Sequence, residues 1–596
     1  MTEATQMRPS LSPRTDLEIH YQVAMSQPET HLFEVTLHLK GWRSDRLDLK
    51  MPVWTPGSYL VREYARHLQD FQAMGGGGQS LAWRKQSKNH WQVETVGVSE
   101  ITVQYRIYAN ELTVRTNHLD ITHGYFNGAA LFFYIPEFQH CPIQVTIVPP
   151  RVDWPIATTL PAIPHQKHTF LAADYDTLVD SPFEVGYHRT YEFEALGKTH
   201  QFVLWGSGNI DPEQTVVDIK KIIETEAALF GGLPYDRYMF LLHIAAQGFG
   251  GLEHKNSCSL IYSRFGFQTD DRYHRFMQLV AHEFFHLWNV KRIRPKGLEV
   301  FDYEGENYTP SLWFSEGATS YYDITFPLRA GIYDARVFLK SLSKEISRYL
   351  TTPGRQVQPL SESSFDAWIK LYRRDSNSDN SQISYYLKGE MVSLLLDLRI
   401  RAKFNNQRSL DDVLRQLWQQ FGQPEIGFTP EELQTVIESV AEEDLSDFFH
   451  RYLDTTEELP FDRYLEPFGL QVQPDTEDLE PFLGMTVRSE NGREVVKFVE
   501  ANSPARRAGL DPDDELLAID SLRVKASDLS DRLKCYAAGE TIHVSVFHQD
   551  ELRTYRVTLT EPRPTSYQLV PVKDPSPAQK QALEGWLGTT WETIQS

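Results

Sequence analysis

The stretch His282-Glu283-Phe284-Phe285-His286 decides what the middle of this chain can be. Apolar residues at helical spacing surround it, and they predict an amphipathic helix from about Arg272 to Val290, with a core face at Phe276, Leu279, Val280 and Leu287. Residues four positions apart lie on one face of a helix, so the two histidines can bind one Zn²⁺ at about 2.0–2.1 Å each. Glu283 can take a proton from the attacking water. Two core histidines beside a solvated glutamate are the alternative explanation of this motif alone.

A second segment offers the third ligand that a catalytic zinc usually has. Glu316 stands in Trp313-Phe314-Ser315-Glu316-Gly317-Ala318-Thr319-Ser320-Tyr321-Tyr322, between small and aromatic residues. This is an unusual setting for a surface carboxylate, and a glutamate from a second helix would complete the set His282, His286 and Glu316. The expectation is one zinc ion per chain. For Glu316 taken alone, an ordinary glutamate on a helix surface is the simpler explanation.

Changes in hydrophobic period divide the rest of the chain. Period-two alternation, as at Ile101, Val103, Tyr105 and Ile107, predicts strands before the motif, and helical spacing dominates after it. Short strands return near the C-terminus, after an acidic linker. The predicted divisions are 1–14 (a disordered tail), 15–205 (an N-terminal β domain), 206–330 (an α/β domain), 331–470 (a helical domain), 471–480 (the linker), 481–562 (a small β module) and 563–596 (a C-terminal tail with a short helix at about 577–587).

Composition limits the classes of partner and compartment. With 59 basic and 81 acidic residues, the formal net charge is −22 over 596 residues. Such an acidic surface is unfavourable for binding nucleic acid or an anionic membrane, because like charges repel. No apolar run approaches 18 residues and the N-terminus lacks a signal pattern. Three scattered cysteines fit a reducing compartment. The expectation is a cytoplasmic protein without nucleic-acid or membrane partners.

Taken together, the motifs carry a resemblance to a known family. The pattern His282-Glu283-x-x-His286-x-Trp288, followed by Trp313-x-x-Glu316-Gly317-x-x-x-Tyr321, resembles the gluzincin aminopeptidases. It is most similar to the glycyl aminopeptidase family, which carries a PDZ module near the C-terminus. The 29 residues between His286 and Glu316 exceed the gap in alanyl-type aminopeptidases. The resemblance implies a multidomain α+β fold, with a thermolysin-like catalytic domain at 206–330 and a helical domain that completes the active site.

The segment Gly250-Gly251-Leu252-Glu253-His254 resembles the substrate-binding segment of these aminopeptidases. An extended edge with Gly250 and Gly251 lets a peptide backbone approach and pair as an added strand. The Glu253 carboxylate can form a charge-assisted hydrogen bond to a free α-ammonium group. A glycine turn beside a solvated glutamate is the alternative explanation.

Tyr386-Leu387-Lys388-Gly389 resembles the motif that supplies the family's catalytic tyrosine. A phenol donor suits a developing oxyanion, although the neighbouring Tyr385 could be confused with Tyr386. A buried aromatic residue without a catalytic role is the alternative explanation. The segment Trp54-Thr55-Pro56-Gly57-Ser58-Tyr59 also resembles the family, and it is assigned no catalytic role.

The small β module at 481–562 resembles a PDZ domain. Phe482-Leu483-Gly484-Met485 is similar to a carboxylate-binding loop, and Ser503 to Leu510 is similar to the PDZ modules of bacterial proteases. Leu483, Gly484 and Met485 would hold a C-terminal peptide. A module that packs on the enzyme and binds nothing is an equal alternative.

The function implied by this resemblance is a zinc aminopeptidase that removes small N-terminal residues, glycine or alanine, from peptides. Glu283 would act as the base and Tyr386 as the oxyanion donor. Peptides with a free N-terminus would be the substrates. The alternatives are a zinc endopeptidase guided by its PDZ domain, an inactive PDZ scaffold and, more remotely, an epoxide-hydrolase side activity.

Overall fold

The computed structural model describes residues 17–595, so the tail expected at 1–14 lies outside the described residues. The chain divides into two compact units. Unit 1 is made of the described part of Met1–Glu224, together with Gly232–Leu287 and Val300–Asn307. Unit 2 is made of Thr225–Gly231, Trp288–Glu299 and the described part of Tyr308–Ser596.

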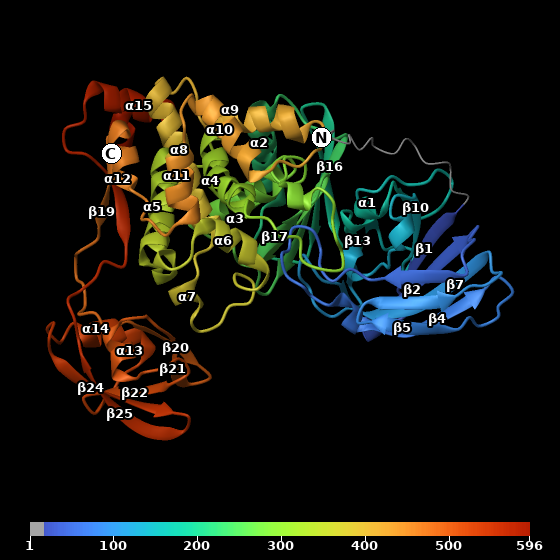
Figure 1. Ribbon diagram of the computed structural model, residues 1–596, viewed down its shortest axis with the longest axis horizontal. Helices are drawn as coiled ribbons and strands as arrows, with labels where there is room; N and C mark the ends of the chain where they lie inside the picture. Colours follow the sequence, from blue (N-terminus) through green and yellow to red (C-terminus); the bar gives the residue numbers. More distant parts are fainter. Residues whose placement is uncertain (1–16, 596) are drawn as a thin grey trace, which may run out of the picture. The chain divides into compact units, whose positions relative to one another are not determined.

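Unit 1 begins with a six-stranded sheet in the order β12-β10-β1-β2-β7-β4 (Figure 1). β2 pairs with β1 and β7 in antiparallel fashion, whereas β10 pairs with β1 in parallel. Alternate residues of β7 are buried, as the period-two pattern predicted. The strands are β1 (Glu18–Ala24), β2 (Leu32–Lys40), β4 (Leu68–Gly75), β7 (Glu100–Tyr108), β10 (Ile143–Val148) and β12 (Thr169–Ala172).

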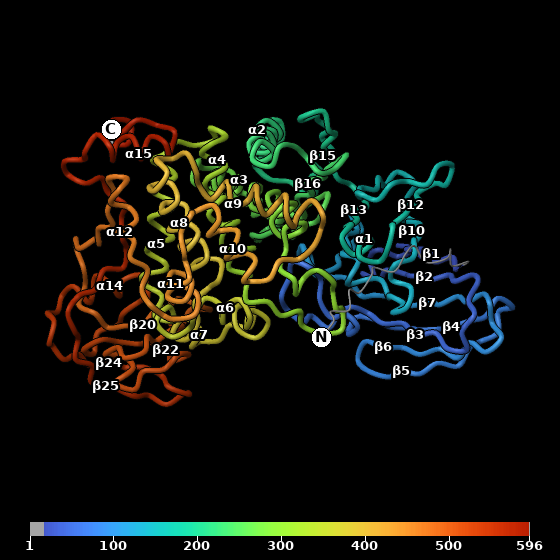
Figure 2. The backbone as a smooth tube through the Cα atoms, turned by 45° about the horizontal axis from the view of Figure 1, so that its top comes forward, coloured from blue at the N-terminus to red at the C-terminus, as the bar shows by residue number. Residues whose placement is uncertain are grey.

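Two smaller sheets complete the N-terminal part of unit 1, in the orders β3-β6-β5 and β11-β13-β9-β8. One apolar cluster, which includes Trp91, Phe126 and Phe183, packs residues of all three sheets together. Figure 2 traces the backbone of these sheets, with β3, β5, β6 and β13 labelled. The additional strands are β3 (Arg46–Lys50), β5 (Trp83–Ser87), β6 (His90–Glu94), β8 (His118–Leu119), β9 (His123–Phe126), β11 (Ile156–Ala157) and β13 (Phe183–Gly186). The short helix α1 (Tyr175–Val179) precedes β13.

The second part of unit 1 is a five-stranded sheet in the order β14-β15-β16-β18-β17. β15, β16 and β18 are parallel, and β17 is an antiparallel edge strand. The strands are β14 (Arg189–Ala195), β15 (Lys198–Trp205), β16 (Arg237–Ala245), β17 (Phe249–Glu253) and β18 (Ser257–Ser263). The sheet starts upstream of the boundary suggested at 205, and the domain boundaries stay predictions.

The helix α3 (Asp270–Phe285) packs against β17 and β18. It ends before the expected residue Val290, because the Leu287 N–H turns back to the Phe284 carbonyl at 3.1 Å and tightens the last turn. The helix α2 (Pro212–Phe230) precedes β16 in the chain.

Helices dominate the first part of unit 2. Fifteen of the 20 residues of the central helix α8 are buried, because other helices surround it. The longer helices are α4 (Thr319–Arg329), α5 (Ala335–Thr351), α8 (Tyr385–Phe404), α9 (Leu410–Leu417) and α10 (Pro430–Ala441). The shorter ones are α6 (Leu360–Phe365), α7 (Ser378–Ser381), α11 (Ser446–Phe449) and α12 (Phe461–Leu465).

A small β module follows, with its own apolar core. The sheet order is β20-β21-β22-β24-β25, with β23 paired to β22, so β20 forms one edge. Its elements are β20 (Met485–Glu490), β21 (Arg493–Val499), α13 (Pro504–Ala508), β22 (Glu515–Ile519), β23 (Leu522–Arg523), α14 (Leu529–Leu533), β24 (Thr541–His548) and β25 (Glu551–Thr558).

The chain enters and leaves this module through a strand pair, β19 (Leu470–Pro474) and β26 (Tyr567–Pro571). The Tyr567 and Leu569 N–H groups donate to Ser347 and Ser343 of α5 at 2.8 and 2.9 Å, which ties β26 to the helices. The expected C-terminal helix is α15 (Pro577–Leu587), followed by α16 (Trp591–Gln595). The multidomain α+β architecture expected from the sequence is confirmed. Within residues 17–595, none of the helices has both the length and the apolar character needed to cross a bilayer.

Candidate metal centre

The two motif histidines lie one turn apart at the C-terminal end of α3. The His286 N–H donates to the His282 carbonyl at 3.3 Å, so the helical spacing continues to the second histidine. The centroids of the two imidazole rings are 4.6 Å apart. Buried residues such as Phe276, Val280 and Phe284 hold α3 in the core of unit 1. The two rings therefore present nitrogen donors from one end of a firmly packed helix.

Glu283 lies against the edge strand β17. A Cβ atom added to Gly251 would lie 2.2 Å from the Glu283 carboxyl carbon, so only glycine leaves room for this carboxyl group. The Glu283 side chain is buried. Burial, opposed by the two histidines and assisted by Glu253, raises the pKa of Glu283 above its ordinary value. A carboxyl group with a raised pKa can both accept and return a proton near neutral pH.

Glu253 ends β17 and joins the same buried group. The ligand-type atoms of Glu253, Glu283 and His286 all lie within 4.8 Å of one another. Burying two carboxylates side by side is costly unless cations or hydrogen-bond donors compensate them. The pair is therefore a candidate for binding a positively charged ligand. Gly250 precedes it with a φ of +142°, and a Cβ atom there would meet nothing within 4 Å.

Two residues that contact this group, Gly57 and Arg115, were not identified from the sequence. Gly57, in the turn that was assigned no role, packs on Glu253, because an added Cβ atom would lie 2.5 Å from Oε1. Its φ of +86° also favours glycine. Arg115 donates from Nη2 to the Gly251 carbonyl at 2.9 Å, and its charge lowers the pKa of Glu283. The Pro-Gly turn gave a weak signal for Gly57, and nothing in the local pattern marked Arg115.

In unit 2, Glu316 lies on the π-helix η6 (Trp313–Ala318). Asn289 donates from Nδ2 to the carbonyls of Phe314 and Ser315, at 3.1 and 3.2 Å, which stabilises the widened turn. Gly317 lies against Gly389 of α8, where an added Cβ atom would be 2.4 Å from backbone atoms. This close helix packing explains the small residue beside Glu316, and Glu316 as a whole is 1% exposed.

Tyr386 lies in the first turn of α8, near Glu316. Burial, followed by the Glu316 charge, raises the pKa of Tyr386 well above its ordinary value, so the phenol keeps its proton. Its hydroxyl oxygen is 3.1 Å from that of Tyr372. Tyr385 stacks on Tyr386 at a centroid distance of 4.8 Å, but it is fully buried, whereas Tyr386 is partly exposed. Of the two tyrosines, Tyr386 is the one able to reach a ligand.

The loop Leu483-Gly484-Met485 opens the edge strand β20 of the small module. The carbonyls of Leu483 and Gly484 accept hydrogen bonds from Ala505 and Glu500, at 3.0 and 2.9 Å. In a trans peptide the next N–H points the opposite way, so the N–H groups of Gly484 and Met485 point away from these bonds. Gly484 has a φ of +81°, and an added Cβ atom would lie 2.2 Å from the Ser503 Cβ. The loop therefore needs glycine for its turn.

Comparison with known proteins gives three family matches. The model described as Peptidase M61 N-terminal domain matches residues 20–187. The model described as M61 glycyl aminopeptidase matches residues 275–392, a range that includes the α3 histidines, Glu316 and Tyr386. The model described as PDZ domain matches residues 481–559. A search of curated proteins returned no match.

Among solved structures, an aminopeptidase N family protein from Idiomarina loihiensis is similar over nearly the whole chain. Its sequence is 34% identical, the match covers 96% of this chain and 100% of that chain, and the TM-score is 0.90. An M1 zinc metallopeptidase from Deinococcus radiodurans is 14% identical over 76% of this chain and 97% of that one, with a TM-score of 0.46. Yeast LTA4 hydrolase in complex with bestatin is 14% identical over 76% and 71%, with a TM-score of 0.45. The last two similarities are too low to inform the site.

Proposed function

We propose how this chain, which belongs to the M61 glycyl aminopeptidase family, removes residues from the amino end of peptides. Membership of the family makes the chain a metallopeptidase and confirms the resemblance seen in the sequence. It also sets aside the inactive PDZ scaffold. The observation that carries the proposal is the buried group Glu253, Glu283 and His286, whose ligand-type atoms lie within 4.8 Å of one another. This group lies beside β17, an edge strand with which a peptide can pair.

Zinc is the metal that these donors fit. Two imidazoles from one helix and a carboxylate are a common ligand set for catalytic zinc. We assign His282 and His286, at the end of α3, as zinc ligands. We add Glu316 as the third ligand because of the sequence motif and the family. When bound, zinc polarises the scissile carbonyl and makes water a stronger nucleophile at neutral pH. One ion per chain is proposed at this centre.

Glu283 is the proposed general base. Its buried carboxyl group accepts a proton from the attacking water and then donates it to the leaving amine. The contact with Gly251 fixes the carboxyl group beside β17, where the scissile bond would lie. Tyr386, which keeps its proton, donates a hydrogen bond to the oxyanion that develops on the carbonyl.

Glu253 is the proposed anchor for the substrate α-ammonium group. A buried carboxylate at the end of an edge strand stops the peptide there and compensates its positive charge. This makes the enzyme an aminopeptidase rather than an endopeptidase. The preference for glycine or alanine at the first position is proposed from the family.

Hydrolysis of amino-acid arylamides tests this function. We expect glycyl and alanyl arylamides to be cleaved faster than leucyl arylamide. Removing the metal with a chelator should abolish cleavage, and stoichiometric zinc should restore it. An N-acetylated alanyl arylamide should not be cleaved. Equal cleavage of free and acetylated substrates would instead favour the endopeptidase, and activity that survives complete metal removal would contradict the zinc assignment.

Replacing Tyr386 with phenylalanine tests the oxyanion donor. We expect kcat to fall by about 10²- to 10³-fold, because one preorganised donor to the transition state is lost. KM should change little, since the ground-state carbonyl carries less charge. Tyr385→Phe is the matched control, and its kcat should stay within a few-fold of the unchanged enzyme. A loss in Tyr385→Phe that equals the loss in Tyr386→Phe would show that the tyrosines act by packing.

The small module is proposed to bind a peptide C-terminus. The outward N–H groups of Gly484 and Met485 can hold the terminal carboxylate, and β20 is free along one edge of the sheet for an added strand. Leu483, the first residue of the loop, is buried in the apolar core of the module and anchors the loop there.

A further inference from the structure

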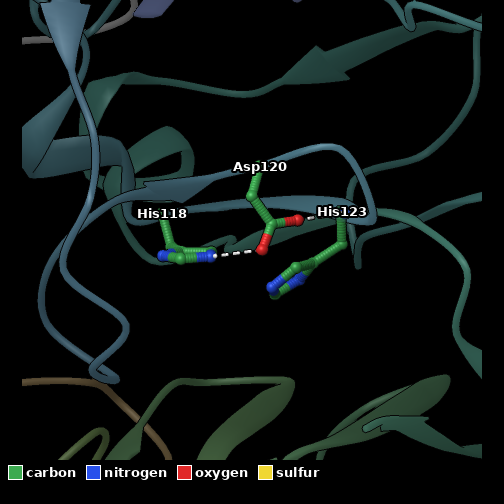
Figure 3. A group of neighbouring side chains, drawn as sticks. All are labelled: His118, Asp120 and His123. Atoms are coloured by element: carbon green, nitrogen blue, oxygen red, sulfur yellow. Dashed lines mark hydrogen bonds and ion pairs between the residues drawn. The ribbon is translucent and has the colours of Figure 1, made fainter. Parts of the chain in front are cut away.

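A second group of ligand-type side chains lies on the β8–β9 hairpin of unit 1. His118 is on β8, Asp120 is in the turn and His123 begins β9. Figure 3 shows the three side chains converging on one another. One ligand-type atom from each residue lies within 4.8 Å of the other two. His118 and Asp120 are 13% and 31% exposed, so an ion can reach the group from solvent.

The turn fixes the Asp120 carboxylate. Its Oδ1 atom accepts hydrogen bonds from the N–H groups of Thr122 and His123, at 2.7 and 3.1 Å, and from the Thr122 hydroxyl at 2.6 Å. The other oxygen, Oδ2, is therefore directed at His118 Nε2, at 3.2 Å. Two ligands at tetrahedral angles on a metal, each about 2.0–2.1 Å from it, would be roughly 3.3 Å apart. The observed separation is close to that value.

His123 is held in the orientation of a metal ligand. Its Nδ1 atom is 2.8 Å from Glu184 Oε1, and a carboxylate can only accept, so Nδ1 carries the proton. The lone pair of Nε2 is then available, and this buried atom has no hydrogen-bond partner among residues 17–595. Trp205 stacks on the ring at a centroid distance of 3.7 Å. A histidine whose second nitrogen donates to a carboxylate is the usual arrangement around zinc.

Glu184 is itself held from its other side. Its Oε2 atom is 2.9 Å from His243 Nε2, and both side chains are fully buried. The separations of 2.8 and 2.9 Å around Glu184 are hydrogen-bond lengths, shorter than the spacing of two ligands on one metal. Glu184 and His243 therefore support His123 from outside the ligand set.

We propose that His118, Asp120 and His123 bind a second divalent transition-metal ion, of the zinc class, in addition to the ion at the motif histidines. Two imidazoles and one carboxylate leave a further position for water, as zinc sites allow. The ion would fix the β8–β9 hairpin. The hairpin follows Arg115, which holds the Gly251 carbonyl, so the second ion would also steady the strand that receives the substrate.

Metal content of the full-length protein tests this inference. After loading with zinc and dialysis, the unchanged protein should hold two zinc ions per chain by mass spectrometry. Asp120→Asn should hold one, because the amide keeps the Oδ1 acceptor of the turn but offers no charged ligand. His282→Ala/His286→Ala should also hold one, and adding Asp120→Asn to that variant should leave none. His90→Ala, which removes a similar pair with Asp48 at 2.7 Å, should still hold two.

A second measurement separates binding from misfolding. In the His282→Ala/His286→Ala variant, zinc should raise the thermal unfolding midpoint, and Asp120→Asn should remove that increase. If the unchanged protein holds one zinc ion and the His282→Ala/His286→Ala variant holds none, the inference is wrong and the hairpin group is a hydrogen-bonded support. The motif centre would be unaffected by that result, because its own variants report on it separately.

Discussion

Replacing Glu283 with glutamine is expected to lower kcat for alanyl arylamide hydrolysis by about 10²- to 10⁴-fold, which is the usual contribution of a positioned general base. Glutamine has nearly the same shape, so it should still fit against Gly251. It cannot accept the proton of the attacking water or pass one to the leaving amine. KM should change little, because the base acts in the transition state rather than in substrate binding.

Two controls make this result specific to Glu283. The variant should bind as much zinc as the unchanged protein, since the imidazoles of His282 and His286 are untouched. Glu224→Gln, an exposed glutamate on α2, should leave kcat unchanged. If Glu283→Gln keeps its zinc and more than roughly a tenth of kcat, another group must be the base.

Local sequence patterns were sufficient to predict much of the fold. Alternation in β7 and helical spacing in α3 each depend on neighbours a few residues apart, and the structure has both elements close to the expected positions. Pairing between distant segments carries no such signal. The parallel pairing of β1 with β10 joins residues more than a hundred positions apart, and no local pattern indicates it.

The residues of the candidate site also divide into those that a local sequence pattern indicates and those that no local pattern indicates. The spacing of His282 and His286 is local, so the sequence could indicate the pair. Gly57 and Arg115 support Glu253 and Gly251 from segments far away in the chain, and only folding brings them there. The π-helix at Glu316 was also hidden, because its widened turn depends on hydrogen bonds from Asn289.

Glu253→Gln is expected to lower kcat/KM for substrates with a free α-amino group by roughly 30- to 5,000-fold. This corresponds to a loss of about 2–5 kcal/mol of transition-state stabilisation. The substrate ammonium would lose its charged acceptor in a buried place, while glutamine keeps the contact with Gly57 nearly unchanged. The measurement compares alanyl arylamide with a des-amino analogue, whose poor cleavage should be the same in both enzymes.

The comparison of the two substrates shows whether Glu253 binds the substrate ammonium directly or acts only by supporting Glu283. Glu253 also lies close to Glu283, and its charge raises the pKa of that base. If Glu253 acted only through Glu283, the variant would lose activity on both substrates in equal proportion. A loss confined to the substrate with the amino group means that Glu253 recognises the ammonium directly. An equal loss on both substrates would leave cleavage from the free amino end unexplained. The endopeptidase would then again be a possible function.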